Sequence, residues 1–122
     1  MVISQGDVYW IEGRNPSGSE PGFRRPVVVL QNDLFNRSRI GTVVVCHLTS
    51  NLKRAHSPGN VLLAKGEANL PKRSVVNVTQ VATLDRTELI DKIGTLSHDR
   101  LIEILDGVYL LLKPWKAIAS GP

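Results

Sequence analysis

Three histidines and one cysteine are the side chains that acid–base or metal chemistry would use first in this sequence. His47 and His56 could act as a pair in which one imidazole accepts a proton and the other donates one, although a structural or surface role is the more ordinary interpretation of each. Cys46 lies in an apolar run, and the sequence has neither paired cysteines nor a His-Glu-x-x-His motif. A phosphate-binding glycine loop and a nucleophile elbow are also missing. We therefore expect a site without a metal or a cofactor.

Basic side chains give the chain its net charge of +4, from 15 Lys and Arg against 11 Asp and Glu. Arg24 and Arg25 precede an apolar run, and Lys53 and Arg54 follow another. Such loops suit a polyanionic partner, but a solvated basic face is an equally good interpretation of them.

Short apolar stretches predict the strands that would position these loops. Val27 to Leu30 is a continuous aliphatic run, which predicts a strand buried on both faces. In residues 42–49, Val44, Cys46 and Leu48 share one face, and His47 and Thr49 lie on the other face near its end. The expected strands are residues 6–12, 27–30, 42–49, 61–64, 74–81 and 92–96.

One helix is expected, near the C-terminus. Ser97 is a plausible N-cap, apolar residues recur at helical spacing up to Leu112, and Pro114 stops the helix. The apolar stripe is broad enough to contact a second subunit as well as its own sheet. We expect a single domain, residues 1–113, built as a curved antiparallel sheet or small barrel, and a flexible tail, residues 114–122.

The stretch from Gly18 to Asp33, read as Gly-Ser-Glu-Pro-Gly-Phe-Arg-Arg-Pro-Val-Val-Val-Leu-Gln-Asn-Asp, follows an early Gly6-Asp7-Val8-Tyr9. Together they resemble the signature of the MazF/PemK toxins. His47-Leu48-Thr49-Ser50 is similar to that family's strand with its functional threonine. Residues 70–76, with Gln80 and Leu84-Asp85-Arg86, resemble its central segment. The likeness covers about residues 4–112.

The resemblance implies a mainly β fold with some α: an SH3-like small β-barrel of the PemK/CcdB type with a C-terminal helix. It implies a homodimeric toxin of a type II toxin–antitoxin system that cleaves single-stranded RNA without a metal. Its partner would be a cognate antitoxin with an acidic, disordered segment. Arg25 and Thr49 correspond to the family's catalytic arginine and threonine, and Glu20 matches a glutamate in the loop over the site.

The chemistry of these side chains agrees with such roles. RNA cleavage by attack of the 2′-hydroxyl needs a base, charge stabilisation at the phosphate and a proton for the leaving oxygen, and it gives a 2′,3′-cyclic phosphate and a 5′-hydroxyl. Arg25 offers a charged fork for phosphate oxygens, Thr49 a hydroxyl donor, and Glu20 a candidate base. Without the resemblance, a structural role would be the simpler interpretation of each.

Further residues are expected to contact RNA. Those we expect to do so are Arg24, His47, Ser50, Asn51, Lys53, Arg54 and Gln80, with Arg14, Lys72 and Arg73 as additional basic candidates. His47 stands where a small or apolar residue would be expected in this family, so it could add acid–base capacity or change base preference.

Two alternatives stay open. A toxin of the same barrel type could poison DNA gyrase by binding alone, as CcdB does, and an SH3-like adaptor could bind RNA without cutting it. The pairing of Arg25 with Thr49 argues against the first, and the few aromatic residues argue against the second. The lone cysteine and the lack of an export signal or long apolar run indicate a cytoplasmic protein that does not enter a membrane.

Overall fold

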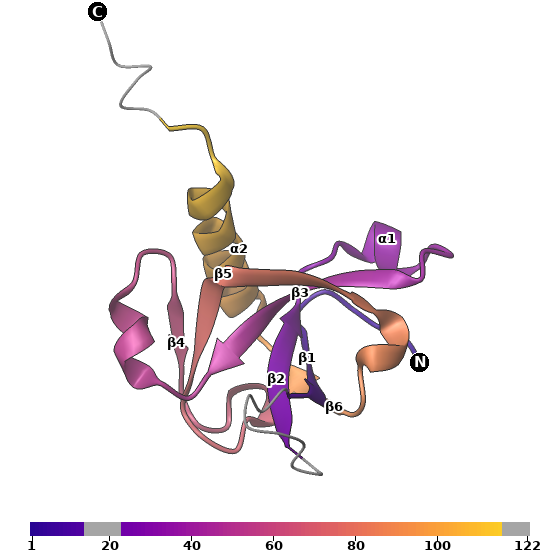
Figure 1. Cartoon of the computed structure of the whole chain (residues 1–122), viewed down its shortest axis with the longest axis horizontal. Coiled ribbons are helices and arrows are strands. Elements are labelled where there is room, and N and C mark those ends of the chain that lie inside the picture. Colours follow the sequence, from indigo (N-terminus) through magenta and orange to yellow (C-terminus); the bar gives the residue numbers. More distant parts are fainter. Residues whose placement is uncertain (14–22, 116–122) are drawn as a thin grey trace, which may run out of the picture.

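The computed structural model describes residues 1–13 and 23–115, which form one curled antiparallel sheet and a C-terminal helix (Figure 1). The strands are β1 (Asp7–Glu12), β2 (Arg24–Val29), β3 (Thr42–Thr49), β4 (Val61–Leu63), β5 (Ser74–Asp85) and β6 (Lys92–Thr95). Their order in the sheet is β4-β5-β3-β2-β1-β6. This half-barrel confirms the predicted mainly β fold with a C-terminal helix.

Each predicted strand is present, but two are longer than expected. β2 begins at Arg24 rather than Val27, because Arg24 and Arg25 pair with Glu12 and Ile11 of β1. β5 continues to Asp85 rather than Val81, because it stays paired with β3 as far as Thr42. Neighbouring strands therefore extend both elements past the point where the apolar pattern ends.

The sheet is buried on both faces near its centre. Val28, Cys46 and Leu48 belong to a core that also includes Ile104 of the C-terminal helix. Val27, Val29 and Val45 belong to a second core on the opposite face. The prediction that residues 27–30 are buried on both faces is confirmed, as is the alternation of residues along β3.

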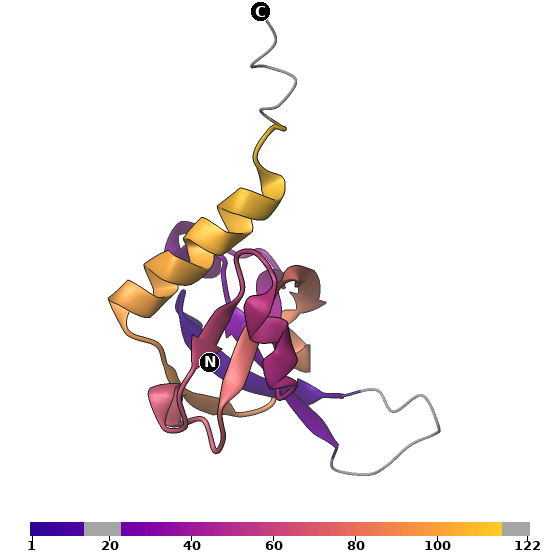
Figure 2. The ribbon, with the colours of Figure 1, turned by 90° about the vertical axis from the view of Figure 1, so that its left-hand side faces the viewer.

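The C-terminal helix α2 (His98–Leu112) packs against β4 and β5 (Figure 2). The Ser97 side chain caps its start, and it ends before Pro114, as predicted. A Cβ atom on Gly107 would lie 2.1 Å from the carbonyl oxygen of Gly59, so glycine is required where the helix crosses this loop. Its last turn, from Tyr109 to Leu112, remains exposed. From residue 116 onward, the predicted tail lies outside the described residues.

Short helices occupy four connections: α1 (Asp33–Asn36), η1 (Leu52–His56), η2 (Glu67–Asn69) and η3 (Arg86–Glu88). The Asn32 side chain caps α1, and a capping box of Asp85 with Glu88 begins η3. None of the helices in the described ranges is long and apolar enough to cross a membrane.

Two of the sequence motifs quoted above, Gly6-Asp7-Val8-Tyr9 and Gln31-Asn32-Asp33, also have structural roles. Asp7 is almost fully buried, accepts hydrogen bonds from Ser4 and Thr95, and pairs with Lys92, whose Nζ lies 3.3 Å from Oδ1. It therefore fastens β6 to β1. In the second motif, the Gln31 side chain accepts a hydrogen bond from the Val44 backbone N–H, which joins the start of the connection to β3.

Candidate active site

Arg25 and Thr49 lie on adjacent strands, just beyond the end of their paired region. The last bonded pair between β2 and β3 is Val27 with His47. Arg25 lies two residues before Val27 in β2, and Thr49 lies two residues after His47 in β3, so both are at the same end of the paired strands. Both line one pocket of about 290 Å³. The pocket therefore unites two of the three catalytic candidates that sequence similarity singled out.

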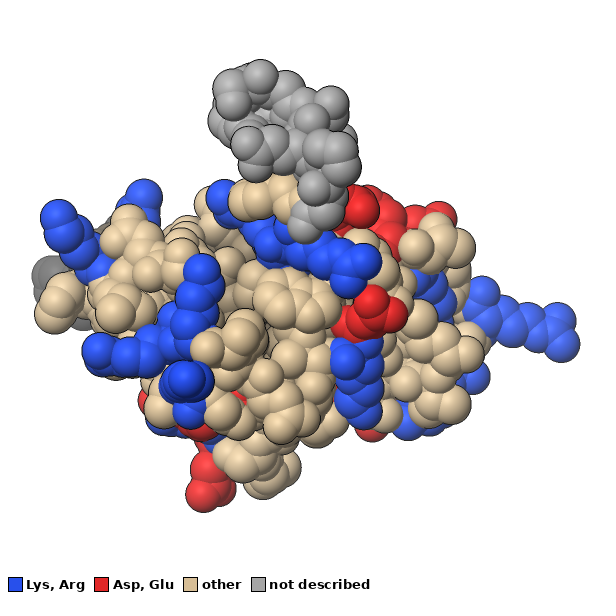
Figure 3. Space-filling model, turned by 90° about the horizontal axis from the view of Figure 1, so that it is seen from below, with Lys and Arg blue, Asp and Glu red and all other residues tan. Residues whose placement is uncertain are grey.

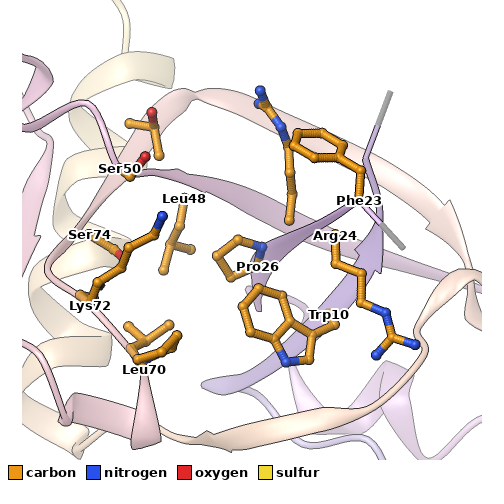
Figure 4. A pocket seen from close by; sticks show the side chains of 12 residues that line it. Trp10, Phe23, Arg24, Pro26, Leu48, Ser50, Leu70, Lys72 and Ser74 are labelled. Atoms are coloured by element: carbon orange, nitrogen blue, oxygen red, sulfur yellow. Dashed lines mark hydrogen bonds between the residues drawn. The ribbon is translucent and has the colours of Figure 1, made fainter. Parts of the chain in front are cut away.

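The pocket combines cations, hydroxyl groups and apolar walls (Figure 4). Its lining residues come from β1, β2, the end of β3 and the segment that leads into β5. They are Trp10, Phe23, Arg24, Arg25, Pro26, Leu48, Thr49, Ser50, Leu70, Pro71, Lys72 and Ser74. An anion with an attached ring system would suit such a surface.

The three cations of the pocket differ in their partners. Arg24 forms an ion pair with Asp91, with Nη1 and Oδ2 3.0 Å apart, and points away from the pocket centre. Arg25 lies over the Phe23 ring, 5.6 Å from its centroid, and has no carboxylate partner among the described residues. Lys72 likewise forms no ion pair within residues 1–13 and 23–115, and its side chain turns toward the pocket. Arg25 and Lys72 are therefore the cations most available to a phosphate.

The Thr49 hydroxyl is oriented by the loop that follows it. Its oxygen accepts a hydrogen bond of 3.1 Å from the backbone N–H of Asn51. The Asn51 side chain in turn accepts from the Lys53 backbone N–H and caps η1. Since the hydroxyl oxygen already has a donor, its own hydrogen is free to point to an acceptor in the pocket.

His47 is half-buried on β3 and does not line the pocket. Burial lowers the pKa of its imidazole, and the nearby Arg25 charge lowers it further. The pairing between β3 and β5 is interrupted beside it, between Cys46 and Leu48. Both effects favour the neutral form of the His47 imidazole.

Only some of the other residues expected to contact RNA line this pocket. Ser50 lines the pocket, whereas Lys53, Gln80 and Arg73 do not. Arg54 lines a separate hollow between η1, β5 and the exposed end of α2, together with Ser57, Pro58, Asn77, Thr79, Leu110 and Leu111. Glu20 and Arg14 lie outside the described residues.

The sequence does not mark Trp10 and Phe23 as pocket residues, because apolar side chains at these positions are typical of an ordinary strand and loop. The partial exposure of Trp10 shows only in the folded chain, where it stands opposite Pro26. In the sequence, Lys72 is only one basic residue among several.

Basic side chains are spread over the face at which β2 begins (Figure 3). Acidic side chains gather in smaller groups on this face. Within the described part of the chain, no three His, Cys, Asp or Glu side chains are grouped so that they could hold a metal ion. The charge distribution favours a polyanion at this end of the molecule.

Residues 4–112 match the family of PemK-like, MazF-like toxins of type II toxin–antitoxin systems. Endoribonuclease MazF6 of Mycobacterium tuberculosis is 44% identical over 112 residues, which cover 92% of this chain and 98% of that protein. Endoribonuclease MazF of Staphylococcus epidermidis is 38% identical over 103 residues, covering 84% and 85%. The crystal structure of MazF from Deinococcus radiodurans superposes with a TM-score of 0.71 at 28% identity, covering 93% of this chain and 99% of that one. A MazE–MazF structure from the same organism gives 0.71 at 26% identity, covering 94% and 99%.

Proposed function

The chain belongs to the family of PemK-like, MazF-like toxins of type II toxin–antitoxin systems, and we propose that it is an endoribonuclease toxin that cleaves single-stranded RNA. The relatives named above are endoribonucleases, which favours RNA cleavage over gyrase poisoning. The observation that carries the proposal in this chain is the meeting of Arg25 and Thr49 in one pocket with no carboxylate partner for Arg25 among the described residues.

The proposed reaction begins with the ribose 2′-hydroxyl on the 5′ side of the cut. Its oxygen attacks the adjacent phosphorus while a base takes its proton, the bond from phosphorus to the 5′-oxygen breaks, and that oxygen receives a proton. The products are a 2′,3′-cyclic phosphate and a 5′-hydroxyl, and no metal takes part. Glu20 remains our candidate for the base, on sequence similarity alone.

Arg25 and Thr49 share the task of stabilising charge on the phosphate. The guanidinium donates two parallel hydrogen bonds to the non-bridging oxygens as negative charge develops there. The Thr49 hydroxyl, whose oxygen is already held by Asn51, adds a third donor without having to reorganise. Stacking on Phe23 limits the positions that the Arg25 side chain can take.

A cognate antitoxin is implied by membership of the family. We propose that an extended acidic segment of it binds the basic surface and continues over apolar side chains. The hollow lined by Arg54, Leu110 and Leu111 supports this, since it places a cation beside the exposed apolar end of α2. Tyr109 and Leu112, exposed on the same turn but outside this hollow, are our candidate contact for a homodimer. An RNA substrate and a reduced Cys46 agree with action in the cytoplasm.

The experiment that tests the function is incubation of the purified protein with end-labelled single-stranded RNA, with and without excess EDTA, beside a gyrase supercoiling assay. We expect cleavage at a short sequence in both RNA samples, fragments ending in a 2′,3′-cyclic phosphate, and normal gyrase activity. A 2′-deoxyribose on the 5′ side of the cut should allow binding and prevent cleavage. Intact RNA with inhibited gyrase would overturn the proposal.

A further inference from the structure

Trp10 presents an aromatic face to the pocket from a rigid position. It lies on β1, which is paired on one side with β2 and on the other with β6. Its backbone N–H donates to the Asp91 carbonyl at 2.9 Å, and its own carbonyl accepts from the Ile90 N–H at 2.8 Å. These contacts fix the backbone position from which the indole reaches the pocket.

The indole lies beside the Pro26 ring, its partner across the two strands (Figure 4). The buried side chains of Leu48 and Leu70 form an apolar wall farther along the same pocket. Although Trp10 is a large apolar residue, it is only partly buried. A half-exposed aromatic ring between apolar walls is the kind of surface on which a nucleobase stacks.

The pocket's size and its neighbours limit what can occupy it. A volume of about 290 Å³ is at the lower end of small-molecule sites, about 300–1,000 Å³, and suits one base rather than a run of bases. Arg25 and Thr49 line the same pocket, so a base bound there would belong to a nucleotide next to the phosphate that they hold. Lys72 lines it too and has no ion-pair partner in the described ranges.

We propose that this pocket is a base subsite, in which the base of a nucleotide flanking the scissile phosphate stacks on Trp10 while Lys72 binds the next phosphate. The proposal rests on the endoribonuclease function proposed above. Stacking tolerates every base, since each has a π face, so Trp10 fixes the position of the RNA more than its sequence. The attached nucleotide is thereby held with its phosphate at Arg25 and Thr49.

The test combines changes in the enzyme with changes in the RNA. The cut site is first mapped with the wild-type protein, and each flanking nucleotide is then replaced in turn by an abasic one, which keeps sugar and phosphate. We expect one abasic position next to the cut to lower kcat/KM about tenfold for the wild type, as for loss of a base stacked on an aromatic ring. With Trp10→Leu the same abasic change should have almost no further effect.

Two further variants serve as controls for this comparison of the wild type with Trp10→Leu on intact and abasic RNA. Trp10→Phe keeps an aromatic face and should retain the abasic effect, which separates stacking from the size of the side chain. Trp115→Leu removes the other tryptophan, which is exposed at the end of the described chain and lies outside the pocket, and should leave the abasic profile unchanged. Circular dichroism checks that each variant is folded.

Fluorescence gives a second measurement that does not depend on cleavage. In Trp115→Phe, Trp10 is the one remaining tryptophan. Saturation with the mapped RNA carrying a 2′-deoxyribose at the cut should change its emission, and the version abasic at the critical position should not.

Equal abasic effects in the wild type and Trp10→Leu at every position, or unchanged Trp10 emission at saturation, would overturn the base subsite. If the wild-type protein cut no RNA at all, the proposed function would fail first, so the two failures can be told apart.

Discussion

The backbone N–H of Asn51 donates a hydrogen bond to the hydroxyl oxygen of Thr49, with the two atoms 3.1 Å apart. This contact ties the orientation of a pocket side chain to the cap of η1, because Asn51 also accepts from the Lys53 N–H. The hydroxyl hydrogen is left free to donate to a ligand in the pocket, which Arg25 also lines.

Replacing Thr49 by valine should lower kcat about 10- to 100-fold, since the variant keeps the shape of the side chain but loses a donor to the developing charge. Thr49→Ser keeps the hydroxyl and should retain most of the activity. Single-turnover cleavage of labelled RNA measures both. Equal rates for the valine and serine variants would show that the hydroxyl does not act on the phosphate.

Arg25→Ala should reduce cleavage by about a thousandfold or more, because several kcal/mol of transition-state stabilisation would be lost. The side chain is exposed, so thermal unfolding should stay within a few degrees of the wild type. Arg39→Ala is the matched control, since Arg39 is exposed and lines neither pocket. A folded Arg25→Ala protein with the original rate would contradict the assigned role.

His47→Gln should change kcat/KM at pH 7 by less than about threefold, ~0.6 kcal/mol, because the imidazole is outside the pocket. Stability should respond instead. The folded pKa of His47 is lowered, so the unfolded chain takes up a proton first and the wild type loses stability as pH falls below about 6.5. Urea unfolding at pH 7 and pH 5.5 should show a smaller loss in the variant. A large loss of activity at pH 7 would instead place His47 in the RNA site.

Glu67→Gln should lower the free energy of unfolding by about 1 kcal/mol at pH 7, since Glu67 accepts two hydrogen bonds from Arg100, of 2.8 and 3.0 Å, at a partly buried site. These hydrogen bonds hold the pKa of the Glu67 carboxyl below its usual value. The unfolded chain therefore binds a proton first, and the contribution disappears as pH falls from about 4.5 through the lower folded pKa. Glu103→Gln, at a more exposed carboxylate, should cost less. Equal losses at pH 7 and pH 3 would exclude this linkage.

Lys53→Glu with Arg54→Glu should weaken antitoxin binding, because both charges lie on the loop beside the exposed end of α2. Lys65→Glu with Arg39→Glu makes the same charge change at exposed positions outside both hollows and should have a smaller effect. Raising salt should weaken RNA binding more steeply than antitoxin binding, since part of the antitoxin contact is apolar. Unchanged affinity in the first double variant would rule out this loop as part of the antitoxin surface.

Local patterns in the amino-acid sequence were sufficient to locate the strands and the capped C-terminal helix, because alternation, capping and proline act over a few residues. Similarity to known toxins was sufficient to select Arg25 and Thr49. Strand ends were less predictable, since pairing partners distant in sequence extended β2 and β5.

The pairing register of the strands and the curl of the sheet determine which residues line the pocket. The pairing of Trp10 with Pro26 turned an ordinary strand residue into a pocket wall, and the path into β5 brought Lys72 to the same pocket. Arg24 forms an ion pair with Asp91. Arg54, on η1, lies beside α2 rather than beside Arg25. Side-chain periodicity assigns a residue to one face of a strand, but which distant residue stands next to it depends on strand pairing, which is set only when the whole sheet forms.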